Sequence, residues 1–507
     1  MSAALGPELV VGLVGAIGSN MSSVSHSLAN ALLAVNYTVE EIHVIDLLHS
    51  FPEWANTPHY PEEKRYEDHI AAGREFCKKL NREDGLVRLG VARIRESRVG
   101  FSNDFHKPYQ RHAYVLRSLK RKAEVELLRY VYGSSFLLVA AHLPRQKRID
   151  YLAKNFADSN HEFDPDRFRA KAEELVEIDE REGDAFGQNV GSTFPLADIF
   201  VSAKNNRDTT KSLERFVEIL FGHPFHTPTP DEYGMMQARV ASLRSADLSR
   251  QVGCAIANAA GDIVSLGCND VPTCGGGLYW EGDSSDGRDF QRGRDASYEM
   301  RRRVLADALQ RLHAMGWLEK TQAARGINEL VEDALHGASG SLMRDSRLMD
   351  LIEFGRTVHA EMDAISTAAR RGVSVGGCTL YSTTFPCHLC ARHVVSSGIS
   401  RVVYIEPYEK SVANELFNDS IVVDDPHSPS GFVNFEHFVG VSPNKYVELF
   451  QMKERKRRDG SALKWPKTSA VPRLSEHEVL YMHKENLLLK EFESELLSAG
   501  LSSFKQA

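Results

Sequence analysis

Two short segments in the second half of the chain carry the residue types of a metal centre. His359-Ala360-Glu361 is followed by Pro386-Cys387-His388-Leu389-Cys390. One imidazole and two thiols can hold zinc, and a zinc site that performs chemistry uses three protein ligands and keeps one position open. Zinc lowers the pKa of water from about 16 to about 7, which supplies a nucleophile at neutral pH. The sequence therefore predicts a catalytic zinc centre with His359, Cys387 and Cys390 as ligands.

Glu361 adds an oxygen base beside that metal. It can take a proton from water and deliver it to a ring nitrogen and then to leaving ammonia, as a hydrolytic deamination requires. The spacing His-x-Glu followed by Pro-Cys-x-x-Cys is the signature of zinc nucleobase deaminases. The alternative is a structural zinc site closed by a fourth ligand from His388, His393 or Cys378. A glutamate two residues after the histidine has no purpose in such a site.

Composition limits the class of protein around this centre. The chain has 507 residues, which predicts about three domains. With 61 basic and 69 acidic residues the net charge is −8, which excludes a surface that is basic throughout for nucleic-acid binding. No run approaches the ~20 apolar residues of a membrane helix, and residues 1–18 resemble a buried strand rather than a signal peptide.

Seven cysteines are an odd and low count for this length, which favours a reducing cytoplasm over a disulfide scaffold. Most cysteines outside the predicted zinc centre are expected to be small buried apolar residues. Cys268 and Cys274 are the pair that could join a second metal site.

Alternating helix and strand patterns surround the predicted zinc centre. The patterns predict helices over 231–245, 359–371 and 388–397, and strands over 252–257, 263–267, 378–382 and 401–405. Residues 275–350 are charged, rich in glycine and then helical, and they interrupt this order as an insertion. We therefore expect an α/β/α domain over 226–450, with a charged helical extension over 451–507.

Residues 242–417 resemble the deoxycytidylate (dCMP) deaminase family within the cytidine-deaminase fold. Six segments match in family order: Leu243–Asp247, Gln251–Ile256, Gly267–Pro272, His359–Ile365, Thr384–Cys387 and Ser397–Val402. The resemblance implies a mixed sheet flanked by helices and a deoxycytidine nucleotide as substrate. It also implies a sugar contact at Asn269, a phosphate contact at Arg244, and nucleotide contacts at Tyr408 and Lys410. The chain departs from the family at Cys268, at Asp270 and in the insertion.

The first half alternates buried strands with helices, which predicts a parallel α/β domain over 1–225. Strands are expected at 9–14, 42–46, 136–140 and 198–201, and helices at 21–35 and 111–132. Three prolines and a glycine within 221–230 mark the domain boundary.

A glycine-containing loop joins the first strand to the first helix in this half. Such loops cradle phosphates with backbone N–H groups, which makes Gly15, Gly18, Ser19 and Ser22 candidate ligands for a nucleotide. Counted from Gly15, the P-loop pattern G-x-x-x-x-G-K-[ST] lacks its second glycine and its lysine.

Later segments resemble P-loop nucleoside-monophosphate kinases, with Arg145 and Arg148 where such kinases carry phosphate-binding arginines. We expect a P-loop-like fold that binds a regulatory nucleotide without phosphoryl transfer. The alternative is a glycine-rich turn in a binding or assembly domain.

The whole arrangement resembles the bacterial anti-phage dCTP deaminases. The resemblance implies conversion of dCTP to dUTP and of dCMP to dUMP, which would deplete dCTP in defence against phage, and inhibition by a small RNA in some members. The basic segment 453–458 is the candidate RNA contact, with a solvated helix end as the alternative. A cytoplasmic homo-oligomer, a hexamer, is expected. Two other functions stay open: a polynucleotide cytosine or adenine deaminase, and a nucleotide-sensing regulator whose P-loop half gates the deaminase.

Overall fold

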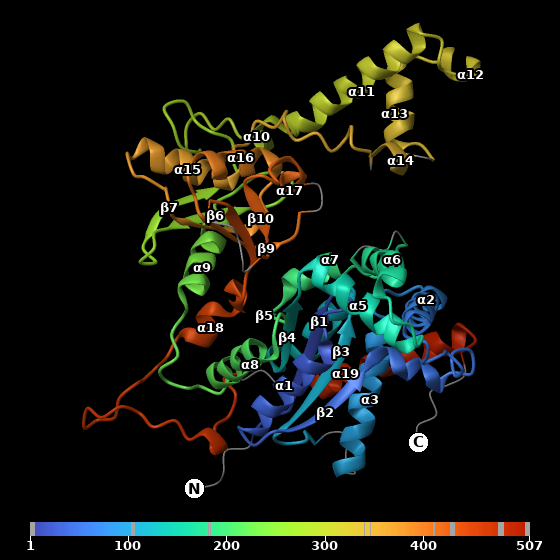
Figure 1. The fold of residues 1–507 in the computed structure, drawn as a ribbon, viewed down its shortest axis with the longest axis vertical. Coiled ribbons are helices and arrows are strands. Elements are labelled where there is room, and N and C mark those ends of the chain that lie inside the picture. Colours follow the sequence, from blue (N-terminus) through green and yellow to red (C-terminus); the bar gives the residue numbers. More distant parts are fainter. Residues whose placement is uncertain are drawn as a thin grey trace. The chain divides into compact units, whose positions relative to one another are not determined.

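The computed structural model describes residues 6–102, 107–180, 182, 184–338, 340–344, 346–408, 411–425, 431–474 and 481–501. The chain divides into two compact units, which are described separately. The first unit comprises Met1–Glu232 with Phe438–Ala507, and the second comprises Tyr233–His437. Both units are mixed α/β structures built on a six-stranded sheet (Figure 1). No helix among the described residues is long and apolar enough to cross a membrane.

The sheet of the first unit has the strand order β12-β5-β4-β1-β3-β2. Its strands are β1 (Leu9–Gly15), β2 (Thr38–His43), β3 (His112–Leu119), β4 (Phe136–His142), β5 (Ile199–Ser202) and β12 (Gly440–Val441). All neighbours are parallel except β12, which pairs antiparallel with β5. Every residue of β1 is buried, as expected for a strand at the centre of a sheet covered on both faces.

Helices surround this sheet, and their apolar faces pack onto it. They are α1 (Met21–Leu33), α2 (Glu62–Leu80), α3 (Gly85–Ser102), α4 (Lys122–Tyr132), α5 (Arg145–Ser159), α6 (Arg169–Glu180), α7 (Val190–Thr193), α8 (Asn206–Leu220), α18 (Tyr446–Phe450) and α19 (Tyr481–Ser498). Residues of α1 and α8 share one apolar core with alternate residues of β1.

Two expectations for this unit differ from the structure. The predicted helix over 111–132 is wrong in its first half, because residues 112–119 form β3 and only Lys122–Tyr132 are helical. His112–Leu116 are all buried in a row, which suits a central strand and not a helix with one solvent face. The tail is helical only in α19 and in one 3-10 turn, Lys467–Ser469, among its described residues after 450.

The helix α19 returns to the first unit through a buried ionic network. Arg98 donates to both carboxylate oxygens of Glu485 at 2.6 and 2.9 Å and to Glu8 at 3.0 Å. Tyr481 donates to the same Glu8 at 2.6 Å. Because removing one partner would leave a buried charge unpaired, this network fixes α19 against the rest of the unit.

The sheet of the second unit has the order β10-β11-β9-β8-β6-β7. Its strands are β6 (Gly253–Ala257), β7 (Ile263–Cys268), β8 (Thr379–Thr384), β9 (Arg401–Glu406), β10 (Ile421–Val423) and β11 (Val433–His437). β6 runs antiparallel to both neighbours, whereas β8, β9, β11 and β10 are parallel. The mixed sheet is the type implied by the dCMP-deaminase resemblance.

Two helices on this sheet, α15 (Ala360–Arg370) and α16 (His388–Ser396), carry the metal-ligand candidates. Their apolar residues share one core with β6, β8 and β9. Gly267 in β7 allows α15 to approach closely, since a β-carbon there would lie 2.3 Å from the carbonyl oxygen of Ala360. The start of α15 is therefore fixed against the sheet.

The remaining helices of the second unit include those of the insertion. They are α9 (Pro230–Ser242), which begins in the first unit, α10 (Asp289–Arg292), α11 (Ala296–Ala314), α12 (Lys320–Ala323), α13 (Ile327–His336), α14 (Gly340–Arg344) and α17 (Ala413–Leu416). The insertion has a small apolar core of its own, centred on Leu305, Val331, Leu335 and Met349.

Candidate active site

The three predicted zinc ligands lie together at the starts of two helices. His359 is the N-cap of α15, Cys387 is the N-cap of α16, and Cys390 lies in the first turn of α16. The Nδ1 atom of His359 is 3.2 Å from the Cys387 sulfur and 3.4 Å from the Cys390 sulfur. One nitrogen and two sulfurs around a common point match the donor set that zinc prefers.

His359 and Cys387 shift each other's pKa through their hydrogen bond and their charges. The hydrogen bond with Cys390, together with that from His359, lowers the pKa of Cys387 to about 4. The bond to Cys387 raises the pKa of His359 to about 9. The helix N-terminus also favours a thiolate, because its unpaired N–H groups carry partial positive charge. The cluster therefore holds a thiolate, which is the form that a metal binds.

Glu361 lies two residues after the histidine, in the first turn of α15, and is buried. The hydroxyl of Ser382 donates to its Oε1 atom at 3.3 Å. Burial raises the pKa of Glu361, and the negative charge of Cys387 raises it further. A raised pKa strengthens the carboxylate as a proton acceptor, which suits a general acid–base.

A cavity of about 280 Å³ opens onto these groups. His359, Glu361 and Cys387 line it, as do the predicted nucleotide contacts Asn269 and Tyr408. The Asn269 side chain accepts from the backbone N–H of Val252 at 2.7 Å and donates to the carbonyl oxygen of Arg250 at 2.8 Å. Asn269 therefore shapes the segment 250–252 at the cavity wall.

The structure does not bring the other two predicted nucleotide contacts to this cavity. Arg244 is not among the cavity-lining residues; its guanidinium donates to the carbonyl oxygen of Leu278 at 3.0 Å and lies 3.5 Å from the centre of the Trp280 ring. Lys410 lies outside the described residues. Phosphate contact by Arg244 remains a prediction, although its guanidinium already holds the start of the insertion.

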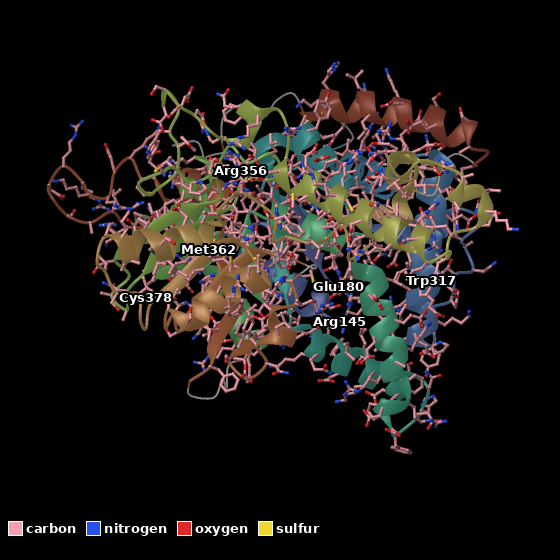
Figure 2. All side chains as sticks on the ribbon, turned by 90° about the horizontal axis from the view of Figure 1, so that it is seen from above. Arg145, Glu180, Trp317, Arg356, Met362 and Cys378 are labelled. Atoms are coloured by element: carbon pink, nitrogen blue, oxygen red, sulfur yellow. The ribbon has the colours of Figure 1, made fainter. Side chains whose placement is uncertain are left out.

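Three arginines that the sequence analysis missed do line the cavity: Arg250, Arg301 and Arg356. Each has a carboxylate neighbour. Arg250 lies 3.6 Å from Glu406, Arg301 lies 3.6 Å from Asp295, and Arg356 pairs with Asp289. Figure 2 labels Arg356 together with Met362 of α15. Of the three, only Arg301 belongs to the concentration of arginines between 288 and 303 in the insertion, and nothing in that run indicates that it reaches the cavity.

The alternative metal arrangements are not assembled. The metal-ligand groups found among the described residues do not include Cys378, His388 or His393 beside the zinc candidates, nor Cys268 with Cys274. Cys378 lies in the apolar core of the second unit, Cys268 is buried and Cys274 is exposed. In the part of the chain described, the three-ligand site has no protein group that closes it.

The glycine loop of the first unit has its expected place between β1 and α1. Gly15, Gly18, Ser19 and Ser22 all line one cavity of about 590 Å³. Gly18 has a φ of +85°, and it lies against the backbone of Arg148, so the loop turns tightly there.

The charges at this loop are already paired within the protein. The Asp179 carboxylate accepts from the backbone N–H of Ile17 at 2.7 Å. Lys120 lies 2.7 Å from the same carboxylate and donates to the carbonyl oxygen of Gly15 at 2.9 Å. Met21 occupies the position of the missing lysine, with its sulfur 2.5 Å from where a β-carbon on Gly15 would lie.

The two arginines suggested for phosphate binding do not line this cavity. Arg148 donates to Glu180 at 2.5 Å, and Arg145 lies 3.6 Å from the same carboxylate. Figure 2 labels Arg145 and Glu180. The loop thus lies at its expected place between β1 and α1, while the two arginines suggested for phosphate binding lie beside Glu180.

Comparison with known proteins places the site of the second unit in a family. Residues 228–406 match the cytidine and deoxycytidylate deaminase zinc-binding region. Over 104 residues the chain is 35% identical to ComE operon protein 2 of Bacillus subtilis (strain 168), which covers 20% of this chain and 52% of that protein. Over 54 residues it is 48% identical to deoxycytidylate deaminase of enterobacteria phage T4, which covers 11% of this chain and 28% of the relative.

The solved structures that are similar include dCMP deaminase of the cyanophage S-TIM5 in complex with dCMP and dUMP. It is 16% identical, covers 42% of this chain and 100% of that chain, and has a TM-score of 0.23. The chain spans about half the length of the Bacillus protein and less than a third of the phage T4 protein. The match of residues 228–406 to the family model, and not this structural likeness, identifies the region around the site as a dCMP/cytidine deaminase zinc-binding region.

Proposed function

We propose that the protein is a zinc-dependent hydrolase that deaminates deoxycytidine nucleotides, dCTP to dUTP and dCMP to dUMP, with release of ammonia. One observation carries this proposal: a buried glutamate, Glu361, lines the same cavity as two members of a Cys₂His cluster, His359 and Cys387. The match to the deaminase zinc-binding region covers all of these residues.

His359, Cys387 and Cys390 would hold the zinc ion. Zinc bound by such a set supplies a nucleophile at neutral pH by lowering the pKa of water to about 7. Glu361 takes one proton of water as the oxygen bonds to C4 of the pyrimidine, and gives that proton to the ring nitrogen N3. It then takes the second proton, from the hydroxyl now on C4, and gives it to the amino group, so that the C4–N bond breaks, ammonia leaves and the C4 carbonyl forms. Ser382 holds the Glu361 carboxyl in place through its hydrogen bond at 3.3 Å. The aromatic ring of Phe385 lines the same cavity and excludes water from that side.

The arginines at the cavity favour a triphosphate over a nucleoside. One guanidinium group can bind two phosphate oxygens at once through two N–H groups. Arg250, Arg301 and Arg356 all line this one small cavity. Each would exchange its present carboxylate neighbour for phosphate. Two of them, Arg301 and Arg356, lie in or beside the insertion that the dCMP-deaminase resemblance does not account for, which ties the insertion to recognition of dCTP.

The direct test is chromatography of the products formed by zinc-loaded full-length protein from dCTP, dCMP, deoxycytidine and a cytosine-containing DNA oligonucleotide. The proposal expects dUTP and dUMP, with turnover falling from dCTP to deoxycytidine. Conversion of the oligonucleotide alone would instead support the polynucleotide deaminase.

For the first unit we propose binding of a regulatory nucleotide at the glycine loop without its consumption. The cavity there is about 590 Å³, and the missing P-loop lysine removes the cation that phosphoryl transfer would use. Lys120 and Arg117 also line this cavity, and a phosphate there would replace their present partners Asp179 and Glu41. A nucleotide that changes deaminase turnover while staying intact would support this role; hydrolysis or transfer of its phosphate would overturn it.

Depletion of dCTP during phage infection is the cellular role that we propose for this activity. Inhibition by a small RNA, assembly into a hexamer and residence in the cytoplasm are further proposals that rest on the sequence resemblance. Plaque counts on cells that express the wild type or Glu361→Ala test the role, since defence should be lost with the catalytic carboxyl. Equal protection by both proteins would separate defence from deamination.

A further inference from the structure

A second cluster of metal-ligand side chains lies in the first unit, away from the residues of the deaminase zinc-binding region. His49, His59 and His69 bring one ring nitrogen each to within 4.8 Å of one another. They come from three successive segments: the 3-10 helix Val44–Ser50, the loop that follows it, and α2. The ring centres of His49 and His59 are 4.7 Å apart, and those of His49 and His69 are 5.4 Å apart.

The hydrogen bonding of His69 leaves one nitrogen available to a metal. Its Nδ1 atom is 2.7 Å from the carbonyl oxygen of Arg65, which can only accept, so Nδ1 carries the proton. The Nε2 atom then presents a lone pair, which is the arrangement that backbone carbonyls impose on metal-bound histidines. This Nε2 atom is buried and has no hydrogen-bond partner among the described residues.

His49 repeats this feature. Its Nε2 atom is also buried and has no hydrogen-bond partner in the described part of the chain. An unsatisfied buried polar atom destabilises the fold, and two in one cluster call for a common partner. Asp46 adds negative charge nearby, with its Oδ1 atom 4.0 Å from the His69 Nε2 atom.

We infer that His49, His59 and His69 form a second metal site, which takes a divalent transition-metal ion of the zinc class. Imidazole nitrogens suit zinc and its neighbours, and they bind zinc at about 2.0–2.1 Å. Closing the cluster onto one ion needs side-chain movements on the order of 1 Å. Three histidines leave one coordination position open, and His69 also lines the cavity beneath the glycine loop. The proposed metal site therefore shares His69 with the cavity of the glycine loop.

The test is the number of zinc ions per chain, measured by mass spectrometry on purified full-length protein after dialysis against a weak chelator. We expect two ions in the wild type, one in Cys387→Ala, one in His59→Ala, and none in the double variant. His59 is exposed, so its substitution should leave the fold intact. His26→Ala is the matched control, because His26 is an exposed histidine outside the cluster, and it should keep both ions.

Cobalt substitution identifies which site is lost. Cobalt bound by the two cysteines gives thiolate-to-metal charge-transfer absorption, whereas cobalt bound by histidines alone does not. His59→Ala should keep that absorption and Cys387→Ala should lose it while retaining one cobalt ion. A wild type that binds one ion, or a His59→Ala variant with an unchanged count, would overturn the histidine site. Retention of the charge-transfer band in Cys387→Ala would instead overturn the zinc ligands of the proposed deaminase.

Discussion

The two units place their functional candidates at the same kind of position, a turn that leads into a helix, yet they treat the polar groups there differently. In the second unit the His359, Cys387 and Glu361 side chains face one cavity and one another. In the first unit Asp179 and Lys120 already satisfy the glycine loop. The polar groups of the second unit are therefore open to a cavity, which agrees with the proposed chemistry there, whereas those at the glycine loop of the first unit are paired with one another.

The largest effect is expected from removal of a metal ligand. Cys387→Ala should lose the zinc ion of the second unit together with deaminase activity, because two ligands no longer form a catalytic site. Zinc content and dUTP formation, measured on the same preparation, check this. Cys378→Ala is the control, since that buried thiol lies outside the cluster and should keep both zinc and turnover. A Cys387→Ala protein with full activity would mean that another group holds the metal.

A smaller loss is expected when the metal stays and the proton carrier goes. Glu361→Gln should retain zinc and lose about 10²–10⁴-fold in turnover, the usual contribution of general acid–base catalysis. Steady-state kinetics on protein of verified zinc content provide the measurement. Turnover near that of the wild type would remove Glu361 from this role.

The cavity arginines should affect discrimination between substrates. A hydrogen bond to a charged group contributes about 1.5–3 kcal/mol, so Arg301→Ala should lower kcat/KM for dCTP by roughly 10–150-fold. The loss for deoxycytidine should be much smaller, because that substrate has no phosphate. Arg303→Ala, an exposed neighbour on α11, is the matched control. Equal losses for both substrates would assign Arg301 to the fold of the insertion instead.

These arginines show where sequence reasoning stops. The grouping of His359, Cys387 and Cys390 beside Glu361 could be predicted because the motif is local: each of its two segments stands at the start of a helix. The roles of these residues as zinc ligands and proton carrier stay predictions. Arg301 reaches the cavity only because the insertion folds back beside the loop at 355–357, a long-range arrangement that no local pattern encodes. The missed strand β3 has a similar cause, since burial on both faces of a sheet removes the alternation that marks a strand.

The internal pairing of charges at the glycine loop can be tested through the stability of the first unit. Asp179→Asn keeps the shape of the side chain but removes the charge that faces Lys120 and the Ile17 amide. We expect the free energy of unfolding of the first unit to fall by about 1.5–3 kcal/mol. Denaturant unfolding followed by a probe in that unit measures it, with the exposed Asp166→Asn as control. An unchanged or raised stability would show that the loop is not held by this pairing.

The smallest effect is expected in how stability depends on pH, and it contrasts two histidines whose pKa values shift in opposite directions. The hydrogen bond with Cys387 raises the pKa of His359, whereas burial lowers the pKa of His112 in β3 from its ordinary 6.5 to about 4. As the pH falls, the unfolded chain binds a proton at this histidine before the folded chain does. The stability that neutral His112 contributes is therefore present above pH 6.5 and is lost as the pH falls toward 4. His112→Phe should flatten this part of the stability profile of the first unit. A profile of unchanged slope would mean that His112 is not the group responsible.

One incubation can show whether deamination occurs in the protein while a nucleotide offered to the glycine loop stays unconsumed. Zinc-loaded full-length protein would be mixed with dCTP and ATP together, and every nucleotide would be quantified over time. We predict that dUTP accumulates in step with ammonia while ATP remains intact. Formation of ADP, or a constant dCTP concentration with zinc verified in place, would contradict the account.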